Sequence, residues 1–164
     1  MLSTMSTFTL IHVAISLAAI ASGFVVLFGM LADKRLDRWT AFFLATTVAT
    51  SLTGFGFPIH GLTPGIEIGI ISLLVLAVAL YARYGRHLAG AWRRVYVISA
   101  VAALYFNFFV LIVQSFQKVP PLKALAPRQT DLPFVVAQRV VLVAFLVLGT
   151  IAVKRFRAQP PIGA

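Results

Sequence analysis

The sequence predicts an all-α polytopic membrane protein, a bundle of five transmembrane helices with the N-terminus outside and the C-terminus in the cytoplasm. Two observations predict this class. Of the 164 residues, 60% are hydrophobic and only 11% are charged, a composition outside the range of soluble globular domains. The apolar residues also form uncharged runs that approach the roughly 20 residues a helix needs to cross a bilayer. The length allows a single membrane domain, residues 1–164.

Five such runs are present, at about 8–31, 39–57, 66–82, 95–116 and 134–153. Prolines and glycines separate them, in residues 57–65 and again in residues 120–133, and neither residue type continues a helix well. The triplet Ala19-Ile20-Ala21 resembles a signal-peptide cleavage site. However, no positive charge precedes the first run, and the run continues to Leu31, so we expect it to stay in the chain as a span.

The positive charges set the expected orientation, because Lys and Arg near span ends stay on the cytoplasmic side. Ten of them fall in the first connection, the third connection and the tail, against three in the fourth connection and none in the second. Tyrosines and tryptophans gather at the same boundary, where their rings favour the head-group layer. The ten residues expected in the cytoplasm are Lys34, Arg35, Arg38, Arg83, Arg86, Arg93, Arg94, Lys154, Arg155 and Arg157.

The charge and the missing cysteine narrow the possible partners and sites. A net charge of +10 would suit nucleic acid, but the basic residues form short clusters beside apolar runs, so we expect no nucleic-acid binding. Membrane lipids are the expected partners, with anionic head groups against the cytoplasmic arginines. The absence of cysteine excludes disulfides and thiolate metal sites.

Polar residues inside the spans are the candidate functional residues, because they are costly in lipid. Most of them fall in the outer half of the bilayer in the expected orientation, with one amide near the middle and one carboxylate at the outer start of the third span. We therefore predict a polar, ligand-binding pocket in the outer half, centred on His12, Arg139 and Glu67. The remaining candidates are Ser16, Thr50, Asn107, Gln114 and Gln138.

Several of these residues also have a structural interpretation. His12 either bonds a neighbouring helix or takes part in ligand binding or proton transfer. Glu67 lies in the first turn of its helix, where a carboxylate interacts favourably with the helix dipole. Arg139 lies about two turns into its span, so it either pairs with Glu67 or binds an anionic group. His60 is expected in an exposed loop.

These features favour a non-catalytic protein, either an accessory or assembly subunit or a protein that binds a lipid or small ligand. It would act alone, as a homo-oligomer or within a larger membrane complex. One alternative is a haem b protein, with His12 and His60 as candidate iron ligands and Arg139 near the propionates. A small transporter or channel is a second alternative. An enzyme is not favoured, because few acid and base groups lie close enough together to act as a pair.

Three segments carry a resemblance to known proteins: 22–29 (SGFVVLFG), 53–58 (TGFGFP) and 87–93 (HLAGAWR). They resemble segments of small multi-pass inner-membrane proteins of bacteria that have no assigned activity. The resemblance covers nearly the whole chain and implies the bacterial inner membrane. It implies no catalytic or ligand-binding residue.

Overall fold

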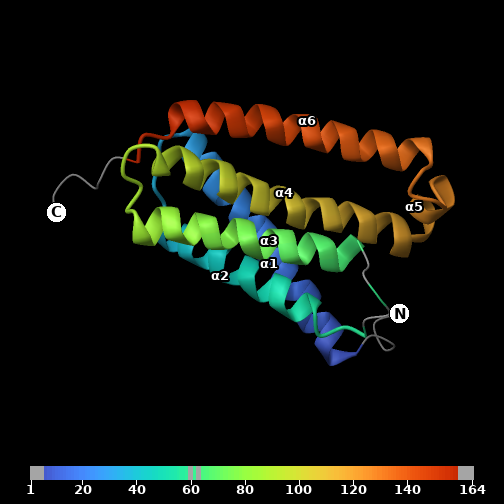
Figure 1. The fold of residues 1–164 in the computed structure, drawn as a ribbon. Helices are drawn as coiled ribbons and strands as arrows, with labels where there is room; N and C mark the ends of the chain where they lie inside the picture. Colours follow the sequence, from blue (N-terminus) through green and yellow to red (C-terminus); the bar gives the residue numbers. More distant parts are fainter. Residues whose placement is uncertain (1–5, 59–60, 62–63, 159–164) are drawn as a thin grey trace.

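The computed structural model describes residues 6–58, 61 and 64–158, and every regular element among them is helical. In chain order the elements are α1 (Thr7–Leu31), α2 (Asp37–Gly54), α3 (Pro64–Leu80), the π-helix η2 (Tyr81–Gly85), α4 (Trp92–Lys118), α5 (Pro120–Leu125) and α6 (Leu132–Arg155) (Figure 1). The five long α-helices begin and end within a few residues of the expected runs. The expected all-helical class is confirmed.

Four helices of the described chain are long and apolar enough to cross a membrane: Thr7–Leu31, Gly65–Gly85, Trp92–Lys118 and Leu132–Arg155. The fifth long helix, α2, has 18 residues, of which six are Ser or Thr and two are the charged pair at its start, so it is less apolar than the others. Length and composition therefore support four of the five predicted spans, and the span at α2 stays a prediction.

Helix α4 holds the bundle together. It contacts α1, α2, α3 and α6, while α2 lies between α1 and α3, and α6 contacts only α4 and α1 among the other long helices. We name the two ends of the bundle by a residue at each. Helices α1, α3 and α6 begin at the Lys118 end and finish at the Arg83 end (Figure 1).

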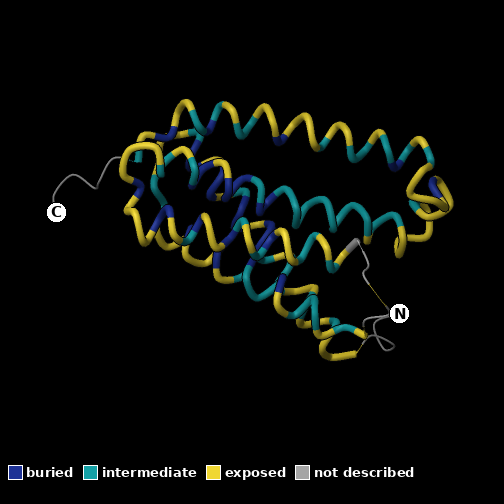
Figure 2. Tube along the Cα trace, in the orientation of Figure 1, coloured by how far each residue is buried: buried dark blue, intermediate teal, exposed yellow. Residues whose placement is uncertain are grey.

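Packing is dense toward the Arg83 end and loose toward the Lys118 end. Buried residues concentrate in the second half of α1 and the first halves of α2 and α4 (Figure 2). Gly23 permits the closest approach there, because a Cβ atom at this position would lie 2.4 Å from Leu104 Cδ1 and 2.9 Å from Phe43 Cε2. Small residues of this kind let membrane helices pack tightly. A large space between the helices consequently lies at the Lys118 end.

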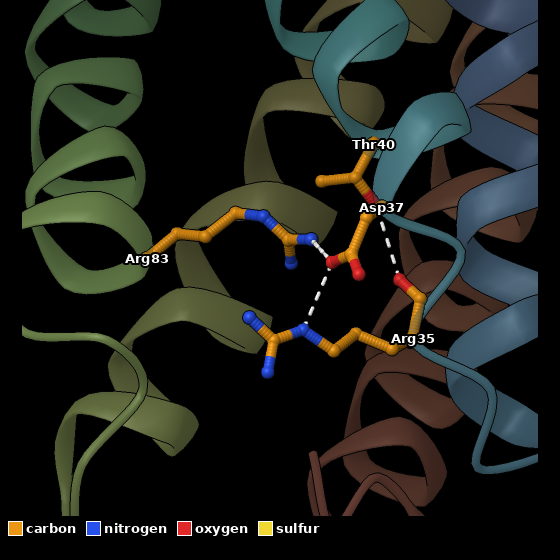
Figure 3. A network of polar contacts seen from close by, with 4 residues as sticks. All are labelled: Arg35, Asp37, Thr40 and Arg83. Atoms are coloured by element: carbon orange, nitrogen blue, oxygen red, sulfur yellow. Dashed lines mark hydrogen bonds and ion pairs between the residues drawn. The ribbon is translucent and has the colours of Figure 1, made fainter. Parts of the chain in front are cut away.

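A polar network ties α2 to the π-helix at the Arg83 end (Figure 3). The Asp37 carboxylate accepts from Arg35 Nε at 2.9 Å and from Arg83 Nη2. The Arg83 side chain is only 2% exposed, and its guanidinium lies 5.3 Å from the Tyr96 ring centroid. The expectation that Arg83 faces lipid head groups is therefore wrong, because the widened π-helical turn directs it into the bundle.

Candidate ligand-binding cavity

At the Lys118 end, a cavity of about 510 Å³ lies between α1, α2, α3 and α4. This volume lies within the range of small-molecule binding sites, about 300–1,000 Å³. Five of the eight predicted ligand-binding residues line it: His12, Ser16, Thr50, Asn107 and Gln114. They come from α1, α2 and α4.

His12 is hydrogen-bonded to α2, and this bond indicates which ring nitrogen carries the hydrogen. Its Nδ1 lies 2.7 Å from Thr53 Oγ1, and the Thr53 hydroxyl itself donates to the Ala49 carbonyl at 2.7 Å. Since Thr53 has one hydrogen to give, its oxygen is the acceptor for His12 Nδ1–H. In neutral His12 the other ring nitrogen, Nε2, therefore carries a lone pair, and no described residue bonds to it. Such a nitrogen can accept a hydrogen bond from a ligand hydroxyl or coordinate a metal ion.

The wall of α2 and α4 supplies further polar groups. Thr50 Oγ1 is buried and has no hydrogen-bond partner in the described chain. Deeper in the cavity, Asn107 Nδ2 donates to Thr47 Oγ1 at 3.4 Å. The Ser16 hydroxyl donates to the His12 carbonyl at 2.7 Å, so it serves its own helix. The cavity wall thus keeps two groups, His12 Nε2 and Asn107 Oδ1, available to a ligand, whereas Thr50 Oγ1 is enclosed by protein atoms.

The rim of the cavity is positive. Lys118 lines it one turn beyond Gln114, and no Asp or Glu is among the lining residues that the structure describes. The remaining wall is apolar, with Leu17, Ile20 and Phe106 toward the interior and Phe57 near the mouth. Sequence reasoning did not select Lys118 for the site. The signal was available in its spacing of four residues from Gln114, which places both on one face of α4.

The other predicted site residues lie away from the cavity. Arg139 is exposed on α6, and no α6 residue lines the cavity. Gln138 donates through Nε2 to the Phe109 carbonyl at 3.3 Å, which joins α6 to α4. Glu67 is exposed on α3, and the ion pairs found in the described chain do not include one between Glu67 and Arg139.

The candidate metal site has little support from side-chain clustering. His60 lies outside the described residues. Within the described part of the chain, no group of three or more His, Cys, Asp or Glu side chains could hold a metal ion. His12 is accordingly the one candidate iron ligand that the structure places at the cavity.

No protein-family model, curated protein or solved structure matches this chain.

Proposed function

We propose that this protein is an integral protein of the bacterial inner membrane that binds a lipid-like amphiphile in the cavity between α1, α2, α3 and α4. The observation that carries the proposal is the cavity itself, which combines apolar walls with His12, Thr50, Asn107 and a positive rim. Apolar pockets with a few convergent polar groups are the usual form of a small-molecule site. The same feature favours ligand binding over a purely structural role as an assembly subunit.

The composition of the wall indicates the ligand class. An apolar body suits the aliphatic and aromatic side chains of the interior, and a polar head suits His12 Nε2 and Asn107 Oδ1. Because Lys118 is the charged residue of the lining and no described carboxylate accompanies it, the head is neutral or anionic. We take a phospholipid or fatty acid as the model ligand.

The proposed topology has five spans, with α2 as the additional one. A helix of 18 residues is about 27 Å long at 1.5 Å per residue, close to the bilayer core of about 30 Å. Helix α2 runs beside α1 and α3 along most of their length (Figure 1). The ten basic residues of the first connection, third connection and tail lie at the Arg83 end, which supports a cytoplasmic assignment for it. The cavity then opens to the outer leaflet.

The topology has its own test, since the chain has no native cysteine. Cysteine introduced at Lys34, before α2, should react with an impermeant maleimide only from the cytoplasmic side, and cysteine at Pro58, after α2, only from outside. Both positions are exposed in loops at opposite ends of the bundle. Labelling of both from the same side would overturn the five-span topology.

A haem b protein is the second candidate, and the His12 arrangement favours it. Histidine ligands commonly donate their second ring N–H to a protein acceptor, as His12 does to Thr53. Oxidised and reduced visible spectra of the purified protein distinguish the candidates: a Soret band lost in His12→Phe supports haem. A transporter is less favoured, because Leu27, Phe43 and Leu104 fill the core beyond the cavity.

Native mass spectrometry of protein exchanged into dioleoyl phosphatidylglycerol tests amphiphile binding. Ser16→Phe fills the cavity and should lower lipid retention at least about ten-fold. Asn107→Leu keeps the volume but removes the amide, and losing about 1 kcal/mol of hydrogen bonding predicts a roughly five-fold reduction. Leu52→Phe on the exposed side of α2 is the control and should leave retention unchanged. Equal retention in all four proteins would contradict the proposal.

A further inference from the structure

Two helices at the edge of the bundle present long exposed faces. Helix α6 buries only Phe134, Phe145 and Ala152. We call its opposite side the α6 face, made of Val136, Arg139, Val140, Val143, Leu146 and Val147, all exposed. Helix α3 similarly exposes Glu67, Ile70, Ile71, Leu74 and Val78, which we call the α3 face. Each face is apolar apart from one charged residue near the Lys118 end.

Arg139 is the charge on the α6 face. It lies seven residues after the start of α6, about 10 Å along the helix. It makes no hydrogen bond or ion pair with any described residue, and no described carboxylate shares its face. An arginine in a membrane helix costs about 2.5–3.5 kcal/mol on insertion scales when it is central. An arginine on an exposed membrane face therefore favours a partner that neutralises it.

Glu67 is the opposite charge on the α3 face. It too is exposed and is absent from the ion pairs of the described chain. Helix α3 begins nearer the middle of the bundle than α6 does (Figure 1). Both charges lie in the early turns of their helices at the Lys118 end, Glu67 three residues after the start of α3 and Arg139 seven residues after the start of α6.

We propose that a second copy of this chain covers the α6 face with its α3 face and pairs Glu67 with Arg139. A bound lipid phosphate would neutralise Arg139 but leave Glu67 unpaired. One contact between copies satisfies both residues and covers two apolar faces, so charge complementarity selects the second copy as the occupant.

The geometry also specifies the register and the kind of assembly. Both helices run from the Lys118 end to the Arg83 end, so they are parallel across the contact. Residues the same number of positions after Glu67 and Arg139 then lie side by side, which places Leu74 beside Leu146. These two are 64% and 61% exposed. Since α3 and α6 lie on different sides of α4, the contact joins different surfaces, and repeating it gives a ring where the rotation between copies closes.

Disulfide cross-linking in membranes tests this pairing, because the chain has no native cysteine. Differently tagged Leu74→Cys and Leu146→Cys chains are co-expressed and oxidised with copper phenanthroline. A mixed dimer should form, and neither variant expressed alone should cross-link. Leu52→Cys paired with Leu146→Cys is the control and should give no product. Cross-linking of Leu146→Cys with itself, or no product in the mixture, would overturn the proposal.

Charge exchange tests the ion pair within the same assay. Arg139→Glu in both cysteine chains, or Glu67→Arg in both, should reduce the mixed dimer at least about five-fold. Both substitutions together should restore it, because the pair is re-formed with its charges exchanged. Recovery of each variant in membranes at the level of the parent shows that it folds. A doubly substituted pair as impaired as the single ones would refute the Glu67–Arg139 contact.

Discussion

Replacing Asp37 by alanine is expected to destabilise the protein more than replacing its partner Arg83 by methionine. The asymmetry follows from burial: the Asp37 side chain is 55% exposed and the Arg83 side chain only 2%. Removing Asp37 leaves a buried cation without its carboxylate, a change that costs about 3–5 kcal/mol at buried pairs. We expect about 3 kcal/mol, because the rings of Tyr96 and Tyr84 stay within cation–π distance.

Arg83→Met should stay within about 1 kcal/mol of the parent, since it replaces a buried charge by an apolar side chain and leaves an exposed carboxylate. Arg35→Met is the control. It breaks an ion pair with Asp37 in which Arg35 is 32% exposed, and exposed pairs contribute about 0–1 kcal/mol. The assay is steric-trapping unfolding in bicelles. A loss from Arg83→Met as large as that from Asp37→Ala would refute the reasoning.

Two further substitutions test the packing and the cavity. Gly23→Ala should cost about 1–3 kcal/mol in the same unfolding assay, because its Cβ would lie 2.4 Å from Leu104 Cδ1; an unchanged free energy of unfolding would contradict the close packing of α1 and α4. Thr53→Val removes the acceptor of His12 Nδ1 and should lower phosphatidylglycerol retention about five-fold by native mass spectrometry. Thr46→Val, whose hydroxyl bonds only within its own helix, should retain lipid normally, and equal losses in the two variants would count against the role of His12.

The helices could be predicted from the sequence because each apolar run has a length that only a membrane-spanning or buried helix requires. The proline-rich connection was a different case. Pro120 and Pro121 were expected only to end a helix, yet they open the short helix α5, where proline suits the first positions. The prolines thus predicted where α4 ends, but not that a short helix follows it.

The positions of the polar residues along their helices could be predicted, whereas their neighbours could not. His12, Ser16 and Asn107 line one cavity. Arg139 lies on an outer face of α6, since position along a helix does not determine which way a residue faces or which helices are adjacent. Arg83 shows the same limit: its position in a basic cluster indicated lipid, and only the packing of the π-helix against α4, with the ion pair to Asp37, reveals its burial.

A density map of the protein in phosphatidylglycerol nanodiscs tests the binding proposal most directly. The predicted result is elongated density between α1, α2, α3 and α4, with its polar end within hydrogen-bonding distance of His12 Nε2 or Asn107 Oδ1 and its apolar part against Leu17 and Ile20. A cavity filled by water alone, or closed by side chains while ordered lipid lies only on the outer surface, would contradict it.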